Sequence, residues 1–303
     1  MITVLAGGTG SIKIIRGLSA ITSKIAIIAN VGDNFWFQGL YICPDVDTSL
    51  YGLKGILDRE RGWGIRNDSF TFIDTLKRLG EENWFKIGDK DLATHIIRTR
   101  LLREGLSLYQ VIKKITKLYD IKHNVIPATD TPIETRIITD RGDINIQEFW
   151  VKYKGKPRVY DVYYKNVENA KINENVTKLL SHSKSIIIAP ANPISSIGPI
   201  LAIKPIQDEL ISRRKKVLAI SPIIGNKPFS GPAAKYLESK RIEISSLGIA
   251  KFYSRFVSKL VIHKTDHLLS ELILDIGVQP YITNIIMRGP REEVNLAKYI
   301  LAI

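Results

Sequence analysis

The amino-acid sequence predicts an α/β fold, with a Rossmann-like, doubly wound, mainly parallel sheet and a smaller, mostly helical inserted domain. Residues 2–6 and 24–30 are short apolar runs on either side of an amphipathic, helix-like stretch. This pattern is typical of a β-α-β unit, whose parallel strands are buried on both faces. The same alternation of strand and helix patterns returns after residue 185. We therefore expect a core formed by residues 1–60 and 156–303.

The intervening segment, residues 61–155, is predicted to be the inserted domain. Helical periodicity dominates most of it, and a switch to period two around Arg141 and Gly142 predicts a hairpin near its end. Residues 156–175 are polar and irregular, and no element is predicted there. We expect helices at 47–58, 70–79, 90–104, 107–119, 204–213, 232–239 and from 290, and strands at 135–139, 144–150, 185–189, 217–221, 259–263 and 281–287.

The composition excludes several classes of protein. The chain has 303 residues and one cysteine, Cys43, which excludes a disulfide framework and a cysteine-based zinc site. The single cysteine favours a reducing cytosol, so we expect a cytoplasmic protein. No apolar run reaches the ~18 residues that a transmembrane helix needs, so we expect no membrane span. The net charge of +14 would attract nucleic acid, but no nucleic-acid-binding motif is present. We favour a solvated basic surface that attracts small anionic substrates.

A glycine-rich loop, Ala6–Lys13, follows the first predicted strand. Glycines allow backbone N–H groups to approach a phosphate, and the start of the next helix adds positive potential. Gly8, Thr9 and Gly10 are the candidate phosphate-binding residues. The spacing matches neither a Walker loop nor a complete G-x-G-x-x-G fingerprint, because Lys13 stands at the third glycine position. A tight strand-to-helix turn without a ligand is the alternative.

Carboxylates follow the second predicted strand and begin the next helix. Asp33 comes after strand 24–30, where the carboxyl ends of parallel strands bind ligands, and it can hold a ribose, a metal or a hydroxyl. Asp45 and Asp47 stand two residues apart after a proline, and together can face a hard cation such as Mg²⁺ or deprotonate a hydroxyl. The alternative for Asp47 or Thr48 is simple N-capping of the helix.

Four further segments carry chemistry suited to an anionic, ring-bearing ligand. Clustered arginines beside Trp63 suit an anion next to a planar ring. A predicted helix begins near Asp89, where Asp89 or Asp91 can cap the helix and Lys90 and His95 can instead contact a phosphate or hydroxyl. Two turn-rich loops follow later strands, at residues 190–199 and 221–232, and supply small hydroxyls and backbone amides.

These motifs occur together in a specific order along the chain. The set comprises Gly7–Gly10, Asn30–Trp36, Cys43–Thr48, Asp58–Ile65, Gly88–Asp91, Asn192–Ile200 and Ser221–Gly225. From residue 2 to about residue 265, the set resembles the 2-phospho-L-lactate transferase family of deazaflavin coenzyme biosynthesis. The resemblance implies a Rossmann-like fold with a smaller inserted domain.

The resemblance also implies an activity. The family transfers a 2-phospholactate group, or its enolpyruvyl analogue, from a guanosine diphosphate-linked donor. The acceptor is the ribityl hydroxyl of 7,8-didemethyl-8-hydroxy-5-deazariboflavin, GMP is released, and Mg²⁺ is required. Whether the protein forms a homodimer is left undecided, and no membrane or nucleic-acid partner is expected.

Carried over by position, the resemblance assigns roles to individual residues. Asp45 and Asp47 would be catalytic and would bind the metal. The diphosphate would lie on Gly8–Gly10, and the loops of Asn192 and Gly225 would hold the guanosine nucleotide. Lys90 stands where the family more often has arginine. The substrate-binding set is expected to be Gly8, Thr9, Gly10, Asp33, Thr48, Trp63, Asp89, Lys90, Asn192, Ser196 and Gly225.

Two other functions remain as alternatives. A related family shares the Gly-Gly-Thr-Gly start and binds a UDP-sugar as a regulatory protein. The segments Cys43–Thr48 and Arg61–Gly64 argue against it, because neither is expected there. The second alternative is nucleic-acid binding driven by the net positive charge, which would weaken steeply with added salt.

Overall fold

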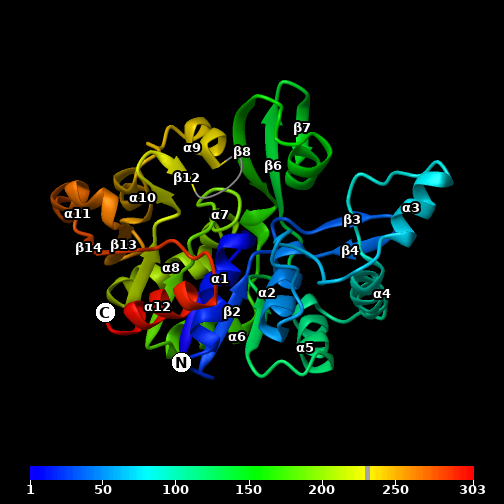
Figure 1. Cartoon of the computed structure of the whole chain (residues 1–303), viewed down its shortest axis with the longest axis horizontal. Coiled ribbons are helices and arrows are strands. Elements are labelled where there is room, and N and C mark those ends of the chain that lie inside the picture. The colour runs from blue at the N-terminus through cyan, green and yellow to red at the C-terminus, as the bar shows by residue number, and fades with distance from the viewer. Residues whose placement is uncertain (229–232) are drawn as a thin grey trace.

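A seven-stranded parallel sheet forms the centre of the molecule (Figure 1). The computed structural model describes residues 1–228 and 233–303. In spatial order the strands are β14 (Gln279–Thr283), β13 (Lys259–His263), β10 (Val217–Ile220), β9 (Ser185–Ile188), β1 (Ile2–Ala6), β2 (Ile25–Ala29) and β5 (Asn124–Pro127). All six neighbouring pairs are parallel. The order reverses between β1 and β9, which makes this gap the topological switch point where doubly wound sheets bind ligands.

Helices cover both faces of this sheet, which confirms the predicted fold class. Helix α1 packs against α2 and α12 on one face, while α6 and α8 pack together on the other (Figure 1). The helices are α1 (Gly8–Ser19), α2 (Pro44–Lys54), α3 (Thr71–Arg78), α4 (Asp89–Arg103), α5 (Leu108–Leu118), α6 (Glu174–His182), α7 (Gly198–Leu201), α8 (Lys204–Ser212), α9 (Ala233–Ser239), α10 (Ser246–Tyr253), α11 (Ser270–Asp275) and α12 (Pro290–Leu301). Short helical turns are η1 (Glu148–Lys152), η2 (Val167–Asn169), η3 (Arg214–Lys216) and η4 (Lys264–Leu269).

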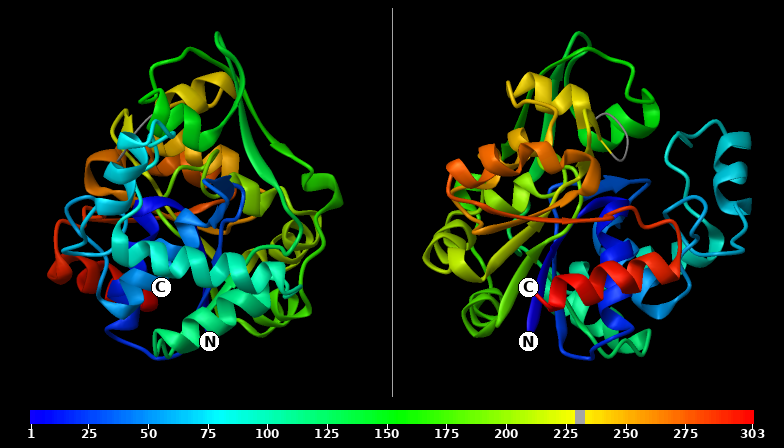
Figure 2. Two further views of the ribbon diagram at one scale, coloured as in Figure 1. Left: turned by 90° about the vertical axis from the view of Figure 1, so that its right-hand side faces the viewer. Right: turned by 60° about the vertical axis from the view of Figure 1, so that its left-hand side comes forward.

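Small antiparallel sheets project from this core (Figures 1 and 2). Strands β6 (Glu134–Thr139), β7 (Gly142–Asn145) and β8 (Val159–Lys165) form one, and η1 lies between β7 and β8. The hairpin β3 (Phe35–Phe37) and β4 (Leu40–Ile42) forms a second, and β11 (Ile223–Ile224) pairs with β12 (Lys227–Pro228). Aromatic side chains of β3 pack on Trp84 and Phe85 in a separate small hydrophobic cluster.

Several sequence predictions need correction. The strand expected at 144–150 ends at Asn145, because Asn145 and Glu148 exchange side-chain and backbone hydrogen bonds and start a helical turn. Strand β8 lies in the stretch expected to be irregular, since Val162 is its only buried residue and no apolar alternation marks it. Helix α2 begins at Pro44, not at residue 47, and the β3–β4 hairpin was not predicted.

The predicted insertion, residues 61–155, is not wholly separate from the core. Its strand β5 pairs with β2 at one edge of the central sheet. The division of the chain into a core and an inserted domain otherwise stays a prediction. The start expected for the helix at residue 232, and the end of the loop 221–232, lie outside the described residues.

Helix α12 is held tightly against α1. The side chain of Arg16 forms a nearly buried ion pair with Glu293, and a Cβ atom added at Gly17 would lie 2.1 Å from the Glu293 carbonyl oxygen. Gly17→Ala should therefore push α12 away and lower the free energy of unfolding by about 1–3 kcal/mol. Urea unfolding measures this loss. Lys13→Ala, on the exposed face of the same helix, should change stability little, and an equal loss in both variants would contradict the contact.

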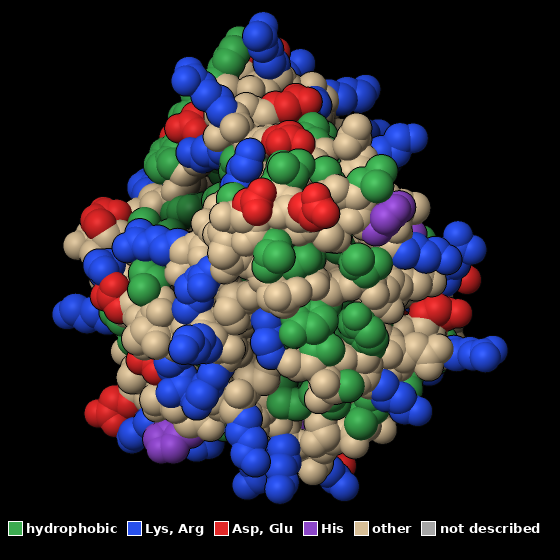
Figure 3. Space-filling view, turned by 90° about the vertical axis from the view of Figure 1, so that its left-hand side faces the viewer, with side chains coloured by type: hydrophobic (Ala, Val, Ile, Leu, Met, Phe, Trp, Pro, Cys, Tyr) green, Lys and Arg blue, Asp and Glu red, His purple; other side chains and the backbone are tan. Residues whose placement is uncertain are grey.

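The side of the molecule that carries α11 and β14 combines scattered charge with exposed apolar residues. Figure 3 shows the side of the molecule on which α11 and β14 lie, where Lys and Arg side chains are interspersed with acids. Leu268, Leu272, Leu274 and Ile282, on η4, α11 and β14, are exposed there. The expected homodimer stays a prediction. Within the described residues, no helix is long and apolar enough to cross a membrane.

Candidate active site

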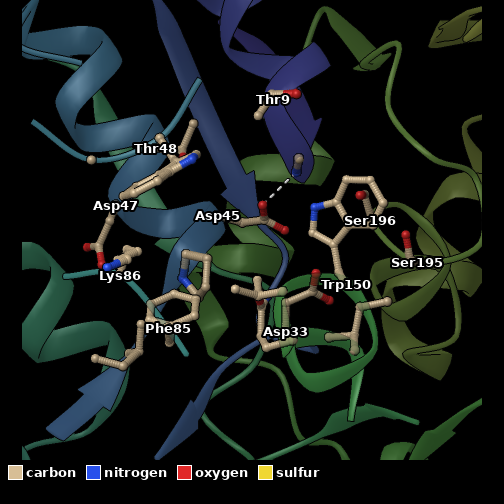
Figure 4. Close-up of a pocket in the computed structure, with 18 of the residues that line it drawn as sticks. Thr9, Asp33, Asp45, Asp47, Thr48, Phe85, Lys86, Trp150, Ser195 and Ser196 are labelled. Atoms are coloured by element: carbon tan, nitrogen blue, oxygen red, sulfur yellow. Dashed lines mark hydrogen bonds between the residues drawn. The ribbon is translucent and has the colours of Figure 1, made fainter. Parts of the chain in front are cut away.

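A cavity of about 510 Å³ lies at the carboxyl ends of the central strands, at the switch point (Figure 4). The loops after β1 and β9 meet there: a Cβ atom at Gly7 would lie 2.5 Å from the Ser196 carbonyl oxygen. Only glycine allows this approach of the two backbones. Most of the predicted site residues line the cavity, namely Gly8, Thr9, Asp33, Asp45, Asp47, Thr48, Trp63, Asn192 and Ser196.

Two carboxylates share one wall of the cavity. Asp45, in the first turn of α2, accepts hydrogen bonds from the Gly8 amide at 2.6 Å and from the Asn30 side-chain amide at 2.8 Å. The same Asn30 nitrogen lies 3.0 Å from Asp33 Oδ1, which Thr135 also contacts. The amide of Asn30 thus links two carboxylates from different loops. This arrangement concentrates negative charge beside the glycine loop.

Burial shifts the proton affinity of both carboxylates upward. Desolvation raises the pKa of Asp45 to about 6, against the opposing hydrogen bonds from Gly8 and Asn30. Desolvation, and then the nearby charge of Asp45, raise the pKa of Asp33 well above its ordinary value. A carboxylate whose pKa lies near neutrality is suited to accept a proton from a reacting hydroxyl.

The raised pKa of Asp45 predicts a pH-dependent stability. The folded state binds this proton more tightly than the unfolded state, so the stabilisation is complete below about pH 4 and is lost as the pH rises through about 6. A shift of this size corresponds to on the order of 2–3 kcal/mol. Urea unfolding of the metal-free protein at pH 4 and pH 7, compared with Asp45→Asn, measures it. A stability difference between the two proteins that does not change with pH would contradict the shift.

Asp47 belongs to a different group of side chains, on the α4 side of the cavity. The guanidinium of the fully buried Arg98 contacts both carboxylate oxygens of Asp47, and its Nη1 lies 3.0 Å from His95 Nδ1. Burial opposes the charge of Arg98, but Asp47, Cys43 and Tyr51 together raise the pKa of the guanidinium, which stays protonated. Asp47 and Asp45 therefore have separate partners, although both line the cavity.

Asp91 and His95 extend this group along α4. Tyr51 donates a hydrogen bond of 2.5 Å to Asp91, and His95 Nε2 lies 3.3 Å from the same carboxylate. Ligand atoms of Asp47, Asp91 and His95 lie within 4.8 Å of one another, close enough to share a metal ion. The buried Arg98, however, already supplies a positive charge to this group.

Comparison with known proteins agrees with this geometry. A protein of the UPF0052 family from Bacillus halodurans has the same fold, with a TM-score of 0.65 and 15% identity over 99% of this chain and 98% of that one. The family model described as 2-phospho-L-lactate transferase CofD matches residues 2–274. The 2-phospho-L-lactate transferase of Methanocaldococcus jannaschii is 39% identical over 99% of this chain and 97% of its own. That of Methanococcoides burtonii is 38% identical over 99% and 98%. The chain belongs to the 2-phospho-L-lactate transferase family.

Membership of the 2-phospho-L-lactate transferase family makes the chain a transferase and confirms the predicted resemblance. The likeness to the UPF0052 structure shows the fold alone, since only 15% of residues are identical. Residues 2–274 span both the glycine loop and every other segment that lines the cavity.

Four residues predicted for the transferase site lie outside the cavity lining. Gly10 packs against the Pro190 carbonyl, where a Cβ atom would lie 2.1 Å away. The carboxylate of Asp89 accepts the amides of Thr71 and Phe72 at the start of α3. Lys90 Nζ donates to the Asn67 carbonyl at 2.5 Å, and the Gly225 amide donates to Asp266 at 2.7 Å. Their predicted roles in substrate binding stay predictions.

Arg98 and Trp150 of this transferase site were not singled out from the sequence, whereas Asp91 was expected only as a possible helix cap and His95 as a possible contact to a phosphate or hydroxyl. Asp91, His95 and Arg98 follow spacings of four and three on α4, which places them on one helical face. This spacing of polar residues on one helical face could have predicted from the sequence that the three side chains lie together. Trp150 also lines the cavity, but a single tryptophan inside a predicted strand carries no comparable pattern.

Proposed function

We propose that this chain transfers a 2-phospholactate or enolpyruvyl phosphate group from a guanosine diphosphate-linked donor to a deazaflavin. The acceptor would be the ribityl hydroxyl of 7,8-didemethyl-8-hydroxy-5-deazariboflavin, and GMP would leave. The observation that carries the proposal is the meeting of the Gly7–Gly10 and Asn192–Ser196 loops at the switch point, beside Asp33 and Asp45. Phosphate-binding loops and paired carboxylates there share one cavity.

The chemistry requires one bond to form and one to break. The acceptor oxygen attacks the phosphorus that carries the three-carbon acid, and the bond from this phosphorus to the bridging oxygen breaks. GMP leaves with that oxygen, and the proton of the hydroxyl passes to a carboxylate. Asp33 and Asp45 suit this task because burial raises the pKa of each. Binding and alignment of the two substrates supply much of the rate acceleration.

The donor set fits a hard divalent cation such as Mg²⁺. Asp33 and Asp45 offer carboxylate oxygens linked through Asn30, and within the described residues neither forms an ion pair with a cationic side chain. Both oxygens of Asp47, by contrast, are engaged by Arg98. We therefore propose that Asp33 and Asp45 divide the roles of metal ligand and proton acceptor, with Asp47 nearby. Bound Mg²⁺ would neutralise charge on the diphosphate.

Incubation with the deazaflavin, a lactyl or enolpyruvyl donor and Mg²⁺ tests the proposal. Mass spectrometry should detect GMP and the phosphodiester product in equal amounts, and chelation by EDTA should stop both. Omission of the deazaflavin is the matched control and should abolish GMP release. Release of GMP without the phosphodiester would identify a hydrolase, whereas binding of a UDP-sugar without any turnover would favour the regulatory alternative.

A further inference from the structure

The turn η1 shapes one wall of the cavity. It is a π-helix, a rare conformation that is frequent at functional sites. Trp150 and Val151 of η1, with Gln147 just before it, line the cavity, and Trp150 is 48% exposed. Figure 4 draws its indole ring among the residues that line the cavity, together with Asp45 and Ser196. A large aromatic ring thus stays half-exposed in the cavity that holds the proposed reacting groups.

The indole of Trp150 rests on a backbone surface. Gly155, with φ of +63°, approaches the ring so closely that a Cβ atom there would lie 3.2 Å from two ring carbons. Gly155 therefore supports the ring from one side without a side chain of its own. The exposed part of the ring lines the cavity (Figure 4).

Contacts with α9 fix this arrangement to the core. Phe149 is fully buried and packs on Tyr236 with ring centroids 5.6 Å apart. Lys235 Nζ lies within hydrogen-bonding distance of three successive carbonyls, at 2.6 Å from Gly155, 3.1 Å from Lys156 and 3.2 Å from Pro157. The turn after η1 is thereby tied to α9. An aromatic ring held in place before binding loses little entropy when a ligand stacks on it.

We propose that Trp150 binds a flat heteroaromatic ring of a substrate by stacking. This role rests on the proposed function, which supplies two such rings, the deazaflavin of the acceptor and the guanine of the donor. Trp63 and Phe85 also line the cavity, with the Arg61 guanidinium 5.1 Å from the Trp63 ring. A cavity lined by several aromatic rings suits a conjugated ligand better than an aliphatic one.

Equilibrium binding of each ring-bearing ligand separately tests the role of Trp150. Wild type, Trp150→Ala and Trp150→Phe are titrated with the deazaflavin alone and with GMP alone. Trp150→Ala should weaken one of the two ligands on the order of ten- to a hundredfold, and Trp150→Phe should weaken the same ligand less. The ligand affected identifies which ring stacks. At saturating substrate, turnover should fall much less than binding.

Two further variants separate stacking from general disturbance. Gly155→Ala keeps the indole but pushes it from its support, and should weaken the same ligand. Tyr160→Ala removes an exposed aromatic ring of the same small sheet outside the cavity lining, and should leave binding unchanged.

Trp150→Ala that folds and binds both ligands as tightly as wild type would overturn the stacking role and leave the proposed function intact. Should that variant misfold, unchanged binding by Gly155→Ala overturns it instead. Wild-type protein that binds neither ligand would overturn the proposed function together with the stacking role.

Discussion

Replacing Arg98 with methionine is expected to lower the free energy of unfolding by about 3–5 kcal/mol. Arg98 is fully buried, and its guanidinium is paired with both oxygens of Asp47. The methionine side chain fills similar volume but leaves the carboxylate buried without its positive partner. Urea unfolding at neutral pH measures the loss.

A double-mutant cycle provides the control. Combined with Arg98→Met, the substitution Asp47→Leu removes the orphaned carboxylate and should recover much of the stability, because isosteric apolar pairs often replace buried ion pairs at little cost. Losses that simply add in the double variant would contradict direct coupling of the two side chains. Such a result would also favour the binding of a metal ion by Asp47, Asp91 and His95.

Asp45→Asn should reduce turnover by ~10²-fold or more. The carboxylate lies beside the glycine loop, accepts the Gly8 amide, and has its pKa raised to about 6 by burial. Asparagine keeps the shape but can neither accept the proton nor bind a divalent cation as an anion. Initial rates of GMP release under saturating substrates measure the effect.

Asp74→Asn, on the exposed face of α3 outside the cavity lining, is the matched control and should retain full turnover. Asp33→Asn should resemble Asp45→Asn if the pair acts as a unit. Near wild-type turnover of Asp45→Asn would transfer the catalytic role to Asp33 or Asp47.

Local sequence patterns were sufficient for most of the central sheet. Strands β1, β2, β9 and β10 are short runs of buried aliphatic residues, because parallel strands are covered on both faces. Strand β8 and turn η1 escaped prediction for a different reason. The aromatic residues of β8 are only half-buried at a sheet edge, and η1 depends on the reciprocal contact of Asn145 with Glu148.

Site residues could be predicted where a glycine-rich or polar segment directly follows a predicted strand. Gly8, Asp33 and Asn192 could be placed in one region because the carboxyl ends of parallel strands meet at one edge, whereas Asp45, at a helix start, was assigned to the site through the family resemblance. The partners of each carboxylate could not be predicted. Arg98 reaches Asp47 across 51 positions of the chain, and this contact depends on how α4 packs.

In the proposed reaction, the acceptor hydroxyl attacks the phosphorus that carries the three-carbon acid. A deazaflavin labelled with ¹⁸O in its terminal ribityl hydroxyl tests it most directly. We predict that mass spectrometry will find all of the label in the phosphodiester product and none in the released GMP. Loss of the label from the product, or its appearance in GMP or water, would contradict this account of the reaction.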